Sequence, residues 1–223
     1  MKKLLALTLA LLLTCSATCA EGVNALVTIA LGAERTVSMT PVAVTDADGD
    51  GVVSIADALA CCHAACYVGD DEGFIAVPSE FGLSLVKLWG VDNGGAFGYC
   101  VNHAPAMSLL DPVAEGDHVY AYAYADTTAW SDMYCHFDAD VLTVKAGDAV
   151  TLTLRGNGYD ANWNPVTLPV AGAAITISGE PTAFVTGEGG TVQLTFAEAG
   201  QYMVSAASET QVLVPPVCLV TVE

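Results

Sequence analysis

Basic side chains are scarce in this chain. There are six Lys and Arg residues against 25 Asp and Glu residues, which gives a formal net charge of −19. Two of the six basic residues, Lys2 and Lys3, stand at the very start. A field of this sign repels the phosphates of nucleic acids and anionic lipid headgroups, so we expect no nucleic-acid partner. The same field favours cations.

Long apolar runs are also scarce, and the first one, Leu4–Leu13, is too short to span a bilayer. It follows a charged start and precedes the small residue Ala20, which is the pattern of a secretory signal peptide over residues 1–20. An imperfect lipobox ends at Cys15, so a lipid anchor is an alternative outcome of export. We therefore expect a secreted or cell-surface protein that contacts the membrane only through such an anchor.

Sequence signatures of catalysis are missing. We find no G-x-S-x-G, H-E-x-x-H, phosphate loop or dinucleotide fingerprint. The four histidines form no spaced set, and neighbouring carboxylates mean little in so acidic a chain. We expect a protein that is not an enzyme, with an unrecognised hydrolase as the alternative.

What the chain does have is a calcium-binding pattern at residues 46–57, D-A-D-G-D-G-V-V-S-I-A-D. Oxygen-bearing side chains fall at positions 1, 3, 5, 9 and 12, and Gly51 at position 6 allows the sharp turn. The alternative is an Asp-rich and Gly-rich surface turn. The expected ligands are Asp46, Asp48, Asp50, the backbone carbonyl of Val52, Ser54 (through a water molecule) and Asp57.

The last ligand of this loop, Asp57, is Asp where calmodulin-type loops have Glu. Together with the run D-G-V-V-S-I-A-D, this resembles a single dockerin repeat. A dockerin is built from two such repeats, and the chain has no second D-x-D-x-D-G. The resemblance implies calcium ligation, and a dockerin-like role in docking proteins is an alternative function.

The pattern of the chain changes near residues 137 and 138. Before this point, alternating segments indicate a hairpin and further strands around one amphipathic helix, at residues 54–67. The apolar stripe of that helix consists of Ile55, Ala58, Leu59, Cys62, Ala65 and Cys66. The order predicts an α+β, β-grasp-like domain over residues 21–137. Its expected strands are 24–31, 36–44, 83–88, 95–102 and 117–124.

Several short motifs occur together in this half: D-A-L-A, K-L-W-G-V, G-Y-C-V-N and E-G-D. They resemble the β-grasp domain related to the C-terminal domain of transcobalamin, which occurs in secreted proteins of gut Firmicutes. The resemblance covers about residues 23–137. It implies a β-grasp fold and, as an alternative function, binding of a small cobalamin-like ligand. The calcium loop stands where cobalamin carriers have a plain turn.

Residues 138–223 consist of short alternating segments separated by Gly and Asp turns, which predicts an immunoglobulin-like (Ig-like) β-sandwich. The stretches P-V-A-G-A-A-I-T-I and T-G-E-G-G-T-V-Q-L-T-F resemble bacterial surface Ig-like modules. Such modules are usually spacers or adhesive stalks. The predicted fold is therefore mainly β, an α+β domain followed by an all-β domain.

A row of aromatic side chains alternates with small ones in residues 117–126. Because side chains alternate between the faces of a strand, the small residues should face the helix and the aromatic ones the opposite side. The row either packs against the second domain or forms an exposed platform for a sugar, corrin or peptide. If the row packs against the second domain, the next candidate for a ligand site is the free strand edge with the loops around Trp89, Tyr99 and Asn102. The candidate ligand surface comprises Tyr120, Tyr122, Tyr124, Trp89, Tyr99 and Asn102.

Six cysteines remain after signal cleavage, and three of them lie on the predicted helix. In an exported chain an even number suggests disulfides. Buried free thiols are an alternative, and so is a metal site completed by His63. The cysteines are Cys61, Cys62, Cys66, Cys100, Cys135 and Cys218.

These observations together predict an exported, calcium-binding protein of two domains that acts as a non-catalytic binding or adhesion module. The expected cofactor is calcium. The expected partner is a protein, glycan or small molecule.

Overall fold

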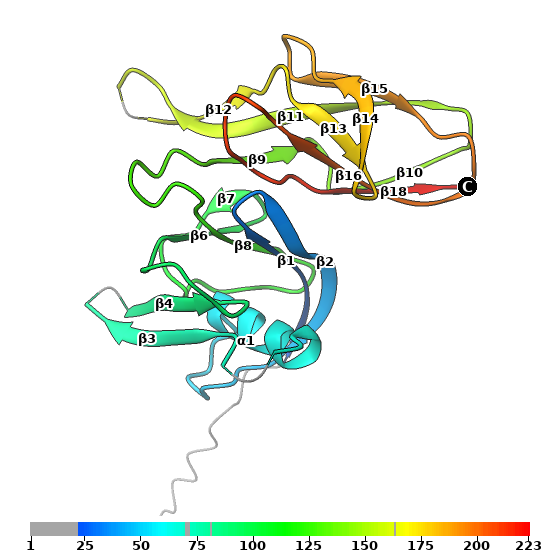
Figure 1. The fold of residues 1–223 in the computed structure, drawn as a ribbon. Coiled ribbons are helices and arrows are strands. Elements are labelled where there is room, and N and C mark those ends of the chain that lie inside the picture. Colours follow the sequence, from blue (N-terminus) through cyan, green and yellow to red (C-terminus); the bar gives the residue numbers. More distant parts are fainter. Residues whose placement is uncertain (1–21, 70–71, 81, 163) are drawn as a thin grey trace, which may run out of the picture.

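The computed structural model describes residues 22–69, 72–80, 82–162 and 164–223. The expected signal peptide at residues 1–20 and the lipobox ending at Cys15 lie outside these residues. The described chain forms two domains that are stacked on one another, and α1 (Ile55–Cys66) lies on the side of the first domain that faces away from the second (Figure 1). No helix within the described residues has the length and apolarity needed to cross a bilayer. The fold is mainly β, as predicted.

The first domain is built on a five-stranded mixed sheet with the order β2-β1-β8-β6-β7. β1 and β8 pair in parallel at its centre, and the other neighbours are antiparallel. Hairpins thus flank a central parallel pair, which is the β-grasp arrangement expected from the sequence. The strands are β1 (Val23–Leu31), β2 (Glu34–Val44), β6 (Phe97–Val101), β7 (Ala104–Pro105) and β8 (His118–Ala123).

One face of this sheet packs against α1 (Ile55–Cys66). Ala121 and Ala123 of β8 share a buried core with Leu59 of the helix, so the small residues of the alternating strand do face the helix, as predicted. A smaller antiparallel sheet adds Leu85 and Leu88 to the same core. Its strands are β3 (Ile75–Ser79), β4 (Gly82–Leu88) and β5 (Val91–Asp92).

The buried stripe of α1 differs from the prediction at its C-terminal end. His63 is buried, whereas Cys66 and Ala65 are exposed. The imidazole of His63 fits the interior because both of its nitrogens have partners. Nδ1 lies 2.7 Å from the carbonyl oxygen of Leu59, and Nε2 accepts the backbone N–H of Trp89 at 2.9 Å.

The second domain is an Ig-like sandwich of two packed sheets. One sheet has the order β10-β18-β16-β13-β14. The other has the order β12-β11-β9-β17, and β15 pairs with β11. The first strand of the sandwich divides between the sheets, because β9 pairs with β11 while β10 pairs in parallel with β18. The strands are β9 (Met133–Phe137), β10 (Val141–Val144), β11 (Ala149–Tyr159), β12 (Pro165–Pro169), β13 (Ala174–Ile177), β14 (Glu180–Val185), β15 (Thr191–Thr195), β16 (Gly200–Ala207), β17 (Leu213–Val214) and β18 (Cys218–Val222).

The structure corrects the position of the domain boundary. The sequence assigned β9 to the first domain and placed the division at residues 137 and 138. In the structure β9 pairs with β11 and β17, and Phe137 belongs to the core of the sandwich. The division therefore lies before β9, in the segment 124–132.

Candidate calcium loop and interdomain cleft

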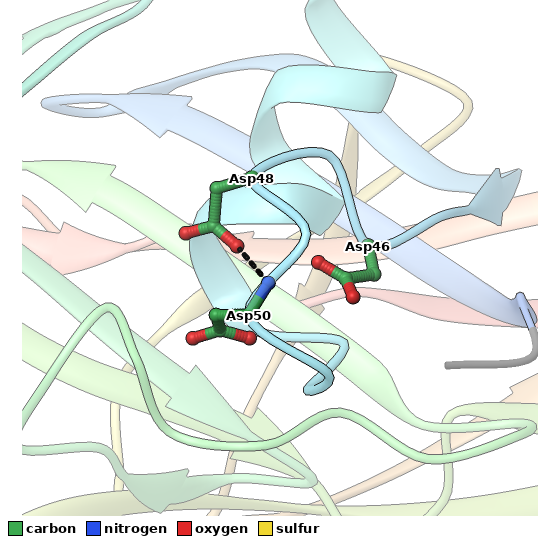
Figure 2. A group of neighbouring side chains, drawn as sticks. All are labelled: Asp46, Asp48 and Asp50. Carbon is green, nitrogen blue, oxygen red and sulfur yellow. Dashed lines mark hydrogen bonds between the residues drawn. The ribbon is translucent and has the colours of Figure 1, made fainter. Parts of the chain in front are cut away.

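The three aspartates at the start of the calcium pattern converge in the structure. Asp46, Asp48 and Asp50 each offer a carboxylate oxygen, and these oxygens lie within 4.8 Å of one another (Figure 2). The loop that carries them joins β2 to α1. Hard cations such as Ca²⁺ prefer carboxylate oxygens, so the donors that the structure gathers fit this ion.

Main-chain N–H groups hold the carboxylates in place. Gly49 and Gly51 donate to the two oxygens of Asp46 at 2.7 and 2.9 Å, and the N–H of Asp50 donates to Asp48 at 3.2 Å (Figure 2). Burial would raise the pKa of Asp46, but these N–H groups lower it overall. For Asp48, desolvation and the neighbouring carboxylates outweigh a backbone hydrogen bond and raise the pKa. Mutual repulsion of this kind would be relieved by a bound cation.

Ser54 and Asp57 are not brought into the group of three. They form the capping box of α1, in which the Ser54 hydroxyl donates to Asp57 at 2.6 Å and the backbone N–H of Ser54 donates to the same oxygen at 2.9 Å. The other oxygen of Asp57 accepts the N–H of Ala47 at 2.9 Å. Asp57 and Asp48 nevertheless line one surface hollow of about 430 Å³. Val52 is exposed and donates its N–H to Asp50 at 2.8 Å.

The aromatic face of β8 lies against the second domain. Tyr120 and Tyr122 are buried in a cluster with Tyr134 of β9 and with Val214 and Val217. The Tyr120 hydroxyl donates to the carbonyl of Pro215. An exposed platform at Tyr120 is therefore wrong, and packing against the second domain is the arrangement found.

Beyond these buried rings the two domains leave a cleft of about 640 Å³. Its first wall carries Tyr122 and Tyr124 together with the turn that follows β6. Its second wall carries the hairpin formed by β11 and β12, with Tyr159 at its tip. Trp130, from the segment that joins the domains, also lines it. Three residues of the predicted ligand surface line this cleft, namely Tyr122, Tyr124 and Asn102.

Trp130 is fixed on an ordered turn. The carboxylate of Asp126 accepts the N–H groups of Thr128 and Ala129 and the hydroxyl of Ser131, while Asp132 accepts two more N–H groups at 2.7 and 2.8 Å. Trp130 itself has a φ of 56°, which is uncommon for a residue with a large side chain. Trp130 is 53% exposed, and its ring lies 5.1 Å from the ring of Tyr124, measured between centroids.

A network of histidines joins the domains beneath the cleft. Asp140 of the second domain accepts from Nδ1 of His118 at 2.9 Å and lies 2.9 Å from Nε2 of His103. Burial would raise the pKa of Asp140, but its hydrogen bonds and attraction to the two imidazoles hold it well below the ordinary value. His103 also stacks on His136 with ring centroids 4.2 Å apart.

Further contacts fix the angle between the domains. Arg35 of β2 donates to the carbonyl of Pro216 at 3.0 Å, and Asn157 of β11 donates to the carbonyl of His103 at 3.3 Å. Polar and apolar contacts therefore cross the interface together.

Trp89 and Tyr99 are not among the residues that line the cleft. Trp89 packs on His63 and Tyr67, and Tyr99 packs against the core between sheet and helix. In contrast, His103, Asn157 and Tyr159 belong to the cleft but were missed. The sequence marks them only as turn-forming and aromatic residues at the end of a strand. Such a local pattern does not indicate which distant segment these residues will face.

The six cysteines within the described residues are free thiols. Burial raises the pKa of the Cys62 and Cys100 thiols to about 12, so both are protonated at neutral pH. Among the described residues, the group able to hold a metal ion is the aspartate group of the loop, and it includes neither cysteine nor His63.

No protein-family model and no curated protein matches this sequence. Solved structures with distant similarity include the four N-terminal Ig domains of Dscam1 isoform 4.4, at 9% identity and a TM-score of 0.27, covering 89% of this chain and 43% of that one. The Ig1-2 module of the Drosophila receptor tyrosine phosphatase DLAR has 10% identity and a TM-score of 0.27, with 70% and 78% covered. The teleost fish polymeric Ig receptor ectodomain has 12% identity and a TM-score of 0.21, with 67% and 73% covered.

Proposed function

We propose that this protein is an exported, calcium-stabilised binding or adhesion module that captures a ligand in the cleft between its domains and leaves it chemically unchanged. The observation that carries this proposal is the cleft itself, whose volume of about 640 Å³ falls in the range of about 300–1,000 Å³ typical of ligand pockets.

The cleft is suited to capture because its parts are held in advance. Trp130 stands on a turn tied down by two aspartates, and the walls are joined by the Asn157–His103 hydrogen bond. A pocket that is already formed loses little conformational entropy when it binds. Interdomain positions are also common places for ligand sites.

Two reactive groups of the lining, Asp132 and Cys100, are poorly suited to catalysis. Asp132 is the one carboxylate among the residues assigned to the cleft, and both of its oxygens accept backbone N–H groups. The Cys100 thiol, whose pKa burial raises to about 12, is a poor nucleophile at neutral pH. Neither group is prepared for acid–base or nucleophilic work.

Calcium has a structural role in this proposal. Asp46, Asp48 and Asp50 would hold the ion in the segment that joins β2 to α1, and Val52, Ser54 and Asp57 remain the proposed further ligands. Calcium would supply positive charge to a group of repelling carboxylates. It would thereby hold the helix against the sheet.

A thermal-shift screen tests the proposal. Calcium-loaded protein would be mixed with libraries of peptides, oligosaccharides and corrinoids, and each hit repeated on Trp130→Ala. We expect at least one ligand class to raise the melting temperature of the wild type and not of the variant. Phe184→Ala, which removes an exposed aromatic ring of β14 outside the cleft lining, is the matched control.

Each hit would also be incubated overnight with the protein and recovered by chromatography. Recovery of the intact compound is expected from a binding module. Turnover of the ligand, or hits that ignore Trp130→Ala, would contradict the proposal.

A further inference from the structure

We infer that the ligand of the interdomain cleft is a neutral saccharide. This inference rests on the proposed function, because it names the chemical class that the same cleft takes. It is carried by three properties of the lining: the arrangement of its aromatic rings, the kind of polar groups beside them, and the lack of Lys and Arg.

The aromatic rings form a surface on which a sugar can stack. Tyr124 and Trp130 are in contact, with centroids 5.1 Å apart, and Tyr122 lies 5.2 Å from Tyr124. Trp130 remains 53% exposed, and Tyr159 on the opposite wall is 65% exposed. The face of a pyranose ring presents C–H groups, and these meet the electron-rich face of an aromatic ring favourably.

The contact between Tyr124 and Trp130 argues against a cationic ligand. A quaternary ammonium is held by rings that surround it, each with its face towards the charge. Rings that touch one another leave no space for a cation between them. The ring of Tyr124 is inclined by 47° to that of Trp130 and by 59° to that of Tyr122, so the three rings offer adjoining, inclined faces.

Most of the polar groups beside the rings are uncharged, and the one carboxylate of the lining, Asp132, already accepts backbone N–H groups with both oxygens. Asn102, Ser131, Thr167 and Gln211 line the cleft and are exposed, and Asn157 faces them from β11. Side-chain amides and hydroxyls both donate and accept hydrogen bonds, which matches the sugar hydroxyl group. The groups are spread over both walls of the cleft.

The charge of the site selects among saccharides. The residues assigned to the lining include no Lys or Arg, and the chain as a whole carries a net charge of −19. A uronate, sulfate or phosphate group would enter this field without a Lys or Arg partner in the lining. The ligand is therefore a neutral sugar chain and not an acidic one.

Titration with defined oligosaccharides tests the inference. Binding would be followed by tryptophan fluorescence and calorimetry on the calcium-loaded full chain, with cellohexaose, xylohexaose, mannohexaose and chitohexaose as neutral probes. Hexagalacturonate serves as the acidic counterpart and choline as the cationic one. We expect at least one neutral probe to bind and hexagalacturonate to bind at least about tenfold more weakly.

Variants locate the binding. Trp130→Ala and Tyr159→Ala should each weaken it by about tenfold, the effect of losing one ring-stacking contact, whereas Phe184→Ala should leave it unchanged. Both substituted rings are exposed, and melting curves identify any variant that fails to fold. With two independent variants, the loss of one leaves the other as the test.

Three results would overturn the inference. One is the absence of saturable binding by all four neutral probes up to about 10 mM. Another is binding that ignores both Trp130→Ala and Tyr159→Ala, and the third is occupation of the cleft by choline or hexagalacturonate instead. If a peptide or corrinoid from the screen fills the cleft, the saccharide inference fails and the proposed function stands. If no class binds there, both fail.

Discussion

The ring of Tyr122 lies directly over Gly98, its partner on the neighbouring strand. Gly98 of β6 and Tyr122 of β8 are paired in register, and a Cβ atom added at Gly98 would come within 2.3 Å of Cζ of the tyrosine. The missing side chain on β6 is therefore what allows the ring to lie against the sheet. From there its hydroxyl lies 3.3 Å from that of Tyr124.

Gly98→Ala should displace the Tyr122 ring and destabilise the protein by about 1–3 kcal/mol, the usual cost of overpacking. Gly158→Ala is a matched control, because its nearest neighbour is a side-chain atom at 3.7 Å and its φ is not positive. Chemical denaturation measures both. Equal stability of the two variants would show that Tyr122 has room to move.

Calcium should raise the melting temperature of the protein. A ligand that binds only the folded state stabilises it by about 2.7 kcal/mol at a hundredfold excess over its dissociation constant. Asp50→Asn should abolish most of this shift, because it removes one of the three converging carboxylates.

Asp148→Asn removes the same charge from an exposed turn of the second domain and should leave the calcium shift intact. Melting curves with calcium and with chelator would measure this. A wild-type curve that responds to neither would refute calcium binding.

The revised domain boundary can be tested with two fragments. A fragment that begins at Asp132 keeps β9, whereas one that begins at Asp138 loses it, together with the buried side chains of Cys135 and Phe137. We expect the longer fragment to unfold cooperatively and the shorter one to be less stable by several kcal/mol, since loss of a large buried aromatic alone costs about 3–5 kcal/mol. Equal midpoints for both would restore the boundary at residue 137.

His63 should make the first domain sensitive to acid. Burial lowers its pKa from the ordinary value of 6.5, so the unfolded chain takes up this proton more readily than the folded one. The stability that the neutral imidazole contributes is complete above pH 6.5 and is lost as the pH falls below it.

His63→Gln should lower stability at pH 8, because Gln cannot reproduce both hydrogen bonds made to Leu59 and Trp89. The variant should also lose less of its stability between pH 7 and 5 than the wild type. Denaturant curves at several pH values compare the slopes, and identical slopes would exclude His63 as the source.

Local periodicity was sufficient for much of the fold. The helix was expected at residues 54–67 and occupies Ile55–Cys66, with Ser54 and Tyr67 as its caps. The alternation in β8 correctly separated the face towards the helix from the face towards the second domain. Residues 133–137 were placed in the first domain and not predicted as a strand, because a short segment does not indicate the distant strands β11 and β17 with which it pairs.

The cleft shows the same limit of local patterns. Tyr122 and Tyr124 were singled out because they alternate within one strand. Tyr159 lies on a hairpin from the other domain, and the contact between Asn157 and His103 joins residues 54 positions apart. Such neighbours are set by the packing of whole sheets. In the proposed calcium loop, by contrast, the three converging aspartates are close in sequence, so their spacing already predicted that they would meet.

The parallel pairs β1–β8 and β10–β18 have a mechanical consequence. In each domain the strand near the entry of the chain lies beside the strand near its exit. Tension between the ends of the chain therefore draws these strands past one another and loads the hydrogen bonds of each pair together. An antiparallel pair would open one bond at a time. A molecule pulled by its two ends would resist extension in both domains, which single-molecule force spectroscopy would record as two separate high-force peaks.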